Sequence, residues 1–364
     1  MNAQKHIVTI LGARPQFVKA AVVSRAISKT PGLRETIIHT GQHSDNNMSD
    51  IFFGELSIQP PAYNLGISGL THGAMTGRML EGIEKILMDL KPDVVMVYGD
   101  TDSTMAGALA AVKLHIPVAH VESGLRSFNR QMPEEINRVV TDHVSDRLFA
   151  PADLAVRNLK YEGVDERKIF QVGDVMYDAV LCYADIAARR STVLEDHNLV
   201  AGKYFLATIH RPQNTDTPEA LTRICDILSE IGKSHTVVLP VHPRMAKHLL
   251  AFGLQLNNVV TLPPVGYLDM LQLERHAALI VTDSGGVQKE AYFHRVPCVT
   301  LRSETEWVEL VETGWNLLMQ PEGNSIEIAG RIIAQSQTKG SDISLYGDGN
   351  AAWKIAQNLN TENF

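Results

Sequence analysis

Short apolar runs rich in β-branched residues alternate along the chain with longer segments in which apolar residues recur every three or four positions. This alternation is typical of parallel sheets whose strands are buried on both faces and connected by helices. The clearest helix follows Thr71, a candidate cap, with apolar residues from Met75 to Leu90 on one face. In the first half of the chain the pattern predicts strands at residues 6–11, 35–40, 93–98, 117–121, 146–150 and 168–172.

The alternation stops in a charged and polar segment, residues 189–203, and then starts again. It predicts a second set of strands at residues 204–209, 236–240, 259–262, 279–282, 298–301 and 316–319. We therefore expect an α/β protein with two Rossmann-like, doubly wound parallel-sheet domains, residues 1–178 and 190–345. The pattern leaves open whether the last helix, within residues 348–364, packs back on the first domain. Ligands of such sheets bind beyond the carboxyl ends of the strands, so we expect an active-site cleft between the domains.

Composition narrows the function classes. A length of 364 residues suits two domains, and 33 basic against 41 acidic residues give a net charge of −8 without any basic block. A nucleic-acid partner is therefore not expected. The three cysteines show no C-x-x-C spacing, which argues against a disulfide framework and a cysteine zinc site. Since a strand begins near the N-terminus and no apolar run could span a membrane, we expect a cytoplasmic protein without a membrane partner.

The residues after the first strand suit an anion. Residues 12–19 provide a glycine for a tight turn, a proline suited to a first helical turn, and two cations, Arg14 and Lys19. Neither G-x-G-x-x-G nor G-K-[ST] is present at this place, so bound NAD and ATP hydrolysis are unsupported. Taken alone, an ordinary surface ion pair explains Arg14 equally well.

Acids follow the next strands of this half. Asp100 and Glu122 each come directly after a predicted strand, and Glu134 begins a helix with Arg138 on the same face, at i and i+4. Each has an ordinary alternative, a helix cap for Asp100 and a solvated ion pair for Glu134 and Arg138. Three acids that converge on one cleft favour an acid/base site.

The second half repeats this arrangement with other chemistry. His210 follows its first strand and His242 follows the next, although a single histidine after a strand is more often a satisfied loop residue. Residues 282–290 run from a buried strand through Ser-Gly-Gly into a helix, where backbone N–H groups can approach a diphosphate. Glu290 lies one turn further, where a carboxylate can accept hydrogen bonds from two ribose hydroxyls.

Together these motifs resemble the non-hydrolysing UDP-N-acetylglucosamine 2-epimerase family, which shares the GT-B fold of glycosyltransferases. The resemblance rests on G-D-T, E-x-G-L-R, P-E-E-x-N-R, H-R-x-x-N and D-S-G-G-x-Q-x-E, in this order along most of the chain. It implies catalytic roles for Asp100, Glu122, Glu134 and His210. It implies contacts with UDP for Arg14, Lys19, Arg138, Ser284, Gly285, Gly286 and Glu290. Gln42 and His43, with His242, are candidates for the family's allosteric site.

Two departures bear on the substrate. Most members read G-T-R-P-E where this chain has Gly12-Ala-Arg-Pro-Gln16, and many read T-E-R-P where it has Thr305-Glu-Trp307. These variants are more similar to the branch that acts on UDP-2,3-diacetamido-2,3-dideoxyglucuronate. The sequence therefore predicts the reaction more firmly than the substrate.

The resemblance implies that UDP-N-acetylglucosamine and UDP-N-acetylmannosamine interconvert through elimination and re-addition of UDP, without a metal or redox cofactor, in a homodimer. Three other functions stay open. A hydrolysing epimerase would release UDP, and the His210-Arg211 motif argues against it. A GT-B glycosyltransferase would need an acceptor site and would have no use for three acids in this spacing. A catalytically silent UDP-sugar sensor would not need to retain them.

Overall fold

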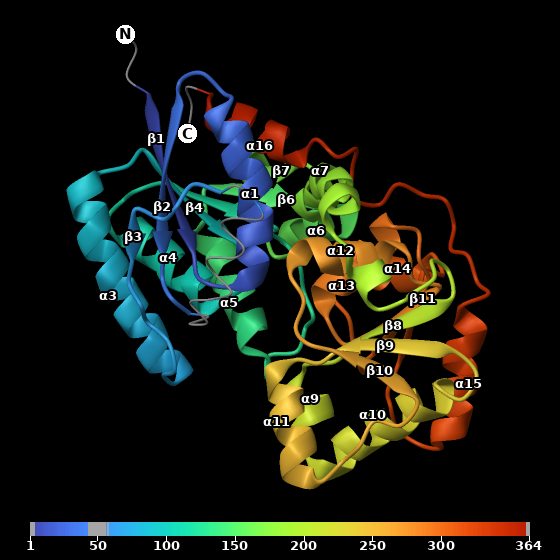
Figure 1. Cartoon of the computed structure of the whole chain (residues 1–364). Coiled ribbons are helices and arrows are strands. Elements are labelled where there is room, and N and C mark those ends of the chain that lie inside the picture. The colour runs from blue at the N-terminus through green and yellow to red at the C-terminus, as the bar shows by residue number, and fades with distance from the viewer. Residues whose placement is uncertain (1–3, 43–55, 57, 362–364) are drawn as a thin grey trace. The chain divides into compact units, whose positions relative to one another are not determined.

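The computed structural model describes residues 4–42, 56 and 58–361. The chain divides into two compact units, each drawn in Figure 1 and treated separately below. Unit 1 comprises residues 1–182 and 344–364, and unit 2 comprises residues 183–343. Helix α7 (Val175–Arg190) crosses the boundary between them.

Unit 1 is built on a seven-stranded parallel sheet with the order β3-β2-β1-β4-β5-β6-β7. This is the order of a dinucleotide-binding Rossmann sheet with one further strand. All six predicted strands are present, and the added β3 pairs with β2 over only two residues, too few to produce a periodic pattern. The strands are β1 (Lys5–Leu11), β2 (Leu33–His39), β3 (Tyr63–Asn64), β4 (Val94–Tyr98), β5 (Val118–Val121), β6 (Arg147–Ala150) and β7 (Ile169–Gln171).

Helices cover the unit 1 sheet. One face carries Val8, Ile10, Val95 and Val97 and packs against α3 and α4, where the apolar stripe predicted in α3 supplies Met79, Ile83 and Leu87. The small alanine side chains of α4 let that helix lie close to the strands. The helices are α1 (Arg14–Ser28), α3 (His72–Leu90), α4 (Asp102–Lys113), α5 (Pro133–Val144), α6 (Asp153–Tyr161), the 3-10 helix η1 (Glu166–Lys168) and α7.

The C-terminal helix α16 (Ala351–Leu359) belongs to unit 1 and lies beside α1 (Figure 1). Its buried face includes Ile355 and Leu359. Its first turn is held by Asp178 of α7, whose carboxylate accepts hydrogen bonds from the N–H groups of Ala351 (3.1 Å) and Ala352 (2.7 Å). A carboxylate at this end of a helix satisfies N–H groups that have no partner within the helix.

Unit 2 repeats the design with a six-stranded parallel sheet in the order β10-β9-β8-β11-β12-β13. Its strands match the predicted ranges except that β8 ends one residue earlier: β8 (Tyr204–Thr208), β9 (Thr236–Pro240), β10 (Val259–Leu262), β11 (Leu279–Thr282), β12 (Cys298–Leu301) and β13 (Asn316–Met319). Its helices are α8 (Val193–Asp196), α9 (Pro212–Thr215), α10 (Pro218–Ile231), α11 (Pro243–Phe252), α12 (Tyr267–Arg275), α13 (Gly285–Phe293), α14 (Val308–Glu312) and α15 (Ser325–Gln335). The predicted fold class, two Rossmann-like parallel-sheet domains, is thus confirmed.

In both units the strand order reverses between the first strand and the fourth, at β1 and β4 in unit 1 and at β8 and β11 in unit 2. Parallel sheets of this order bind ligands beyond the carboxyl ends of these central strands. Asp100, His210 and the turn of Ser284 come directly after three of these strands, and Arg14 opens the helix that follows β1. None of the described helices is long and apolar enough to cross a membrane.

Candidate active site

The turn from β1 into α1 is tightly fixed to its neighbours. A Cβ atom on Gly12 would lie 2.0 Å from the Ser103 hydroxyl, so only glycine fits there. The Gln16 side chain accepts hydrogen bonds from the N–H groups of Gly12 (2.7 Å) and Ala13 (2.9 Å). Its amide donates to the Tyr98 carbonyl (2.8 Å), which joins this turn to the end of β4. The glutamine that departs from the family pattern thus has a structural role.

Of the two cations that follow β1, Arg14 and Lys19, the structure describes the side chain of Lys19. Arg14 is the first residue of α1, but its side chain lies outside the described part of the structure. The Lys19 ammonium lies 2.5 Å from the Glu122 carboxylate, and both side chains are about nine-tenths buried, at 10% and 9% exposed. In so little water this attraction is stronger than in a surface ion pair. Glu122 has a φ angle of 68°, an uncommon conformation for a residue with a side chain.

Asp100 forms a second ion pair at the carboxyl ends of these strands, with Arg138. Strands β4 and β5 are adjacent with Tyr98 opposite Val121, so Asp100 and Glu122 follow neighbouring strand ends. The Asp100 carboxylate accepts two hydrogen bonds from Arg138, from Nη2 at 2.7 Å and Nε at 3.0 Å. The alternative interpretation of Asp100 as a helix cap is wrong, since Thr101 is the N-cap of α4.

Arg138 also pairs with Glu135, whereas the ion-pair alternative named Glu134. Its Nη1 donates to the Glu135 carboxylate at 2.7 Å. That carboxylate also accepts from the N–H groups of Ser127 (2.9 Å) and Phe128 (3.0 Å), which fixes the loop after β5. Burial alone would raise the pKa of Glu135, but the Ser127 N–H and the Arg138 charge outweigh it and hold that pKa below its usual value. Glu134 lies exposed on the same helix.

The first part of the predicted allosteric site also lies at this edge. The side-chain oxygen Oε1 of Gln42 accepts hydrogen bonds from the N–H (3.1 Å) and the hydroxyl (2.6 Å) of Ser103 in α4. Gln42 therefore fixes the start of α4. His43 lies outside the described residues.

In unit 2, His210 is oriented by an aspartate that the sequence analysis did not select. Strands β8 and β11 are neighbours with Thr208 opposite Thr282, so the residues after them come together. Asp283 Oδ1 lies 3.0 Å from His210 Nδ1, with Asp283 fully buried and the His210 side chain 42% exposed. The same carboxylate accepts from the Arg211 N–H (3.0 Å) and the Asn214 amide (2.9 Å).

This environment keeps Asp283 ionised. Burial alone would raise its pKa, but the hydrogen bond and charge of His210, followed by Asn214 and the Arg211 N–H, lower it overall. An ionised carboxylate on Nδ1 fixes the tautomer, so Nε2 is the nitrogen left to exchange a proton. The sequence signal for this residue was its place directly before the Ser-Gly-Gly turn.

The Ser-Gly-Gly turn opens α13. Ser284 is its N-cap, and the Ser284 hydroxyl makes no capping bond. Cβ atoms added to Gly285 or Gly286 would approach no protein atom closer than 3.8 Å, so the protein itself does not require glycine at either place. Backbone N–H groups at the start of a helix, with no side chain covering them, suit a phosphate.

Further side chains surround this turn. A Cβ on Gly285 would lie 3.8 Å from both Glu306 and Trp307. The Thr-Glu-Trp segment, which differs from the family pattern, therefore lies beside the turn. The Lys289 ammonium lies 4.0 Å from the centre of the Trp307 ring. Glu290 is buried, and a Cβ on Gly286 would lie 4.0 Å from its carboxylate.

His242 lies near His210. Its ring centre is 5.9 Å from that of His210, and its Nδ1 accepts a hydrogen bond from the Arg244 N–H at the start of α11. Unit 2 therefore brings His210, His242 and Asp283 together, whereas unit 1 brings together Lys19, Asp100, Glu122 and Arg138. Among the described residues, no group of three His, Cys, Asp or Glu side chains could hold a metal ion.

Comparison with known proteins identifies the family. The family model described as UDP-N-acetylglucosamine 2-epimerase matches residues 25–360. The chain is 51% identical to UDP-2,3-diacetamido-2,3-dideoxy-D-glucuronate 2-epimerase of Pseudomonas aeruginosa, covering 97% of this chain and 99% of the relative. It is 50% identical to a UDP-N-acetylglucosamine 2-epimerase homolog of Methanococcus maripaludis, with the same coverage.

A solved structure agrees with this assignment. The crystal structure of the Methanocaldococcus jannaschii UDP-GlcNAc 2-epimerase in complex with UDP-GlcNAc and UDP superimposes with a TM-score of 0.91 at 45% identity, covering 97% of this chain and 99% of that one. With the family model over nearly the whole length and relatives at half identity, the conclusion is direct: this chain belongs to the non-hydrolysing UDP-N-acetylglucosamine 2-epimerase family of isomerases.

Proposed function

We propose that this chain reversibly inverts C2 of a UDP-2-acetamido sugar, converting UDP-N-acetylglucosamine to UDP-N-acetylmannosamine. The observation that carries the proposal is the pair of acids at adjoining strand ends of unit 1, where Glu122 pairs with Lys19 and Asp100 with Arg138. Inversion needs a group that removes the C2 proton and another that returns a proton to the opposite face. Two carboxylates held in place by Arg138 and Lys19 are suited to these two roles.

The C2 proton of such a sugar is too weakly acidic for direct removal and return, so the C1–O bond must break as well. The electron pair of that bond leaves with UDP, the C2 proton goes to a protein base, and a C1–C2 double bond remains. UDP then adds again to C1 while a proton is delivered to the other face of C2. Of the described groups, the backbone N–H groups that open α13 suit the departing diphosphate.

His210 completes the proposed set. Because the buried Asp283 fixes its Nδ1, His210 presents Nε2 as a proton donor or acceptor. We assign Ser284, Gly285 and Gly286 to the diphosphate and Glu290 to the ribose. Glu134 is exposed at the start of α5 and stays in the proposed set as the third acid.

The test is to incubate the protein with UDP-N-acetylglucosamine and follow the sugar by proton NMR. The proposal predicts a mixture of the two UDP-sugars at equilibrium, and Asp100→Asn should lose nearly all turnover. Accumulation of UDP with free N-acetylmannosamine would point instead to a hydrolysing enzyme. A substrate that stays unchanged with wild-type protein would exclude UDP-N-acetylglucosamine as the substrate.

The second candidate substrate is UDP-2,3-diacetamido-2,3-dideoxyglucuronate. Two observations favour it: the relative that acts on it is 51% identical, and Trp307 stands beside the Gly285 turn where many members have arginine. Running the same assay with both sugars decides between them by their kcat/KM ratio. We also propose a homodimer, as the resemblance implies, which light scattering during gel filtration would test.

A further inference from the structure

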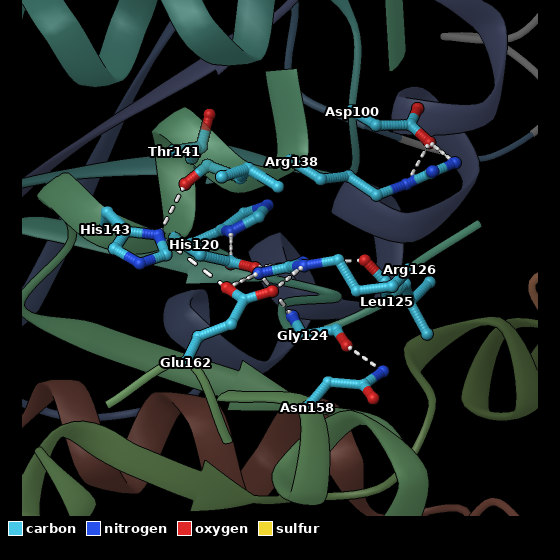
Figure 2. A network of polar contacts seen from close by, with 12 residues as sticks. Asp100, His120, Gly124, Leu125, Arg126, Arg138, Thr141, His143, Asn158 and Glu162 are labelled. Carbon is cyan, nitrogen blue, oxygen red and sulfur yellow. Dashed lines mark hydrogen bonds and ion pairs between the residues drawn. The ribbon is translucent and has the colours of Figure 1, made fainter. Parts of the chain in front are cut away.

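Figure 2 shows, beside Asp100 and Arg138, a further network of charges in unit 1 whose members have no role in the proposed chemistry. Its centre is Asp142 of α5, whose side chain is completely buried. Asp142 Oδ1 lies 2.7 Å from His120 Nδ1, while Oδ2 accepts from the Gly124 N–H (3.0 Å) and from Arg126 Nη1 (2.7 Å). Arg126 in turn donates two hydrogen bonds of 2.7 Å to Glu162.

Each ring nitrogen of His120 lies within hydrogen-bond distance of an oxygen atom. Its Nε2 lies 2.8 Å from the Gly99 carbonyl oxygen, which can only accept. Burial alone would raise the pKa of Asp142, but His120 and Arg126 outweigh it and hold that pKa below its usual value, so this carboxylate also only accepts. Both ring nitrogens of His120 therefore face acceptors, and only an imidazolium can donate to both.

The charges of the network agree with this assignment. The cations His120 and Arg126 balance the anions Asp142 and Glu162, giving a sum of zero. A neutral His120 would leave one uncompensated negative charge in the network, which is costly in a buried setting. It would also turn the lone pair of one ring nitrogen towards an acceptor, either the Gly99 oxygen or the Asp142 carboxylate.

The network holds both turns that carry the acids. The Gly99 carbonyl belongs to the peptide plane that leads directly into Asp100, so fixing that oxygen fixes the direction in which the Asp100 side chain leaves the backbone. On the next strand end, Asp142 binds the N–H of Gly124, two residues after the strained Glu122. A Cβ on Gly124 would lie 2.4 Å from the Ala155 carbonyl oxygen, so this turn is also packed tightly.

We propose that His120 is a positioning residue of the epimerase site: as an imidazolium clamped between Asp142 and the Gly99 carbonyl, it sets the place of the Asp100 carboxylate. The inference rests on the proposed function, because it assumes that Asp100 takes part in the reaction. A hydrogen bond from a charged donor is about twice as strong as one between neutral groups. His120 is thus suited to fix the turn at Gly99 and Asp100 while Arg138 attracts the Asp100 carboxylate.

The test compares His120→Gln with the matched control His143→Gln. Glutamine can still donate to one acceptor, but it carries no charge and cannot bridge Asp142 and Gly99 as the ring does. We expect kcat to fall on the order of 100-fold, the loss that a displacement of about 1 Å can cause, with KM and the UDP dissociation constant little changed. His143 lies at the edge of the network, 45% exposed and 3.8 Å from Glu162, so its variant should keep wild-type kcat.

A purely structural role would give a different result: fewer folded molecules, each with normal kcat, which UDP titration of the active fraction would reveal. Nitrogen-15 NMR of the wild-type protein adds a measurement that needs no variant, and it decides the matter if His120→Gln does not fold. It should find both ring nitrogens of His120 protonated at the pH of the assay. A ring nitrogen without a proton would overturn the inference.

The failures can be told apart. Wild-type protein that turns over neither UDP-sugar would overturn the proposed function and this inference with it. Active wild-type protein combined with an unimpaired His120→Gln variant would overturn only the inference.

Discussion

The two units share one strand order, but the residues at the carboxyl ends of their strands differ in chemistry. In unit 1 two ion pairs lie there, Lys19 with Glu122 and Arg138 with Asp100. In unit 2 the edge carries a helix start with glycines uncrowded by the protein, and a half-exposed histidine held by a buried aspartate. Paired carboxylates can move protons, whereas free backbone N–H groups can hold an anion.

The difference teaches how one fold supplies two kinds of site. Both edges follow from the reversal of strand order at the first and fourth strands, so the fold fixes the place, and the residues after the strands fix the chemistry. On this account, changes in unit 1 should reduce turnover, and changes at the α13 turn of unit 2 should reduce UDP affinity. The predictions below test this division.

The largest effect is expected for Asp100→Asn. The substitution keeps the size of the side chain and removes its capacity to take a proton, so kcat should fall on the order of 1000-fold. The UDP dissociation constant, measured by calorimetry, should stay close to that of the wild type. Asp153→Asn, on the exposed start of α6, is the matched control. An equal loss of UDP affinity in Asp100→Asn would contradict the division between the units.

Asp283→Asn should have the next largest effect. The amide would present an N–H₂ group to one of the donors that now bind the carboxylate, so His210 loses its fixed orientation. We expect kcat to fall on the order of 100-fold, and the free energy of unfolding to fall by about 1–3 kcal/mol. Asp216→Asn, an aspartate of the same unit paired with Arg244, should leave kcat unchanged. Equal kcat values in the two variants would exclude an orienting role for Asp283.

Gly286→Ala separates ligand contact from protein packing. The nearest atoms to an added Cβ, in Ser284 and Glu290, lie at 3.9 and 4.0 Å, and alanine favours a helix more than glycine does. Thermal stability should therefore stay the same or rise slightly. A methyl group among the N–H groups should weaken UDP binding about tenfold, or by about 1.4 kcal/mol. Gly330→Ala on α15, where an added Cβ meets nothing within 4 Å, should leave UDP affinity unchanged.

The smallest effect is expected for Asp178, which holds the first turn of α16 and lies away from both candidate sites. Burial, with the charges of Asp174 and Asp348, raises the pKa of Asp178 from 3.8 to about 6, although the N–H groups of α16 lower it. A raised pKa means that its stabilising contribution is complete below pH 3.8 and is lost as the pH rises through about 6. Asp178→Asn mimics the protonated group.

The stability of Asp178→Asn relative to the wild type should therefore increase from pH 5 to pH 8, by on the order of 1 kcal/mol. Chemical denaturation at a series of pH values measures it. Parallel stability curves would show that Asp178 is ionised in the folded protein throughout. Turnover should not change, since Asp178 belongs to neither edge.

The fold was predictable because its signals are local. Buried parallel strands appear as apolar runs, and the residues after them can be read directly, which is how Asp100, Glu122 and His210 were selected. The contact between His210 and Asp283 joins residues 73 positions apart. It depends on β8 pairing with β11, and no periodicity along the chain encodes that pairing.

The partner of Arg138 was not predictable for a similar reason. Glu134 and Glu135 are both within helical reach of Arg138, at i−4 and i−3. The loop of Ser127 and Phe128 gives Glu135 three further donors, two N–H groups and the Ser127 hydroxyl, which favour Glu135. The network of His120 and Asp142 likewise joins β5 to α5 and requires the folded structure to be seen.

The most direct test of the account is the rate at which deuterium from the solvent enters C2 of the UDP-sugar, measured by NMR with wild-type protein and with Asp100→Asn at saturating substrate. The account predicts deuterium at C2 in both epimers with the wild type, and almost none with Asp100→Asn despite normal UDP binding. Epimerisation by the wild type without deuterium at C2, or wild-type exchange by Asp100→Asn, would contradict it.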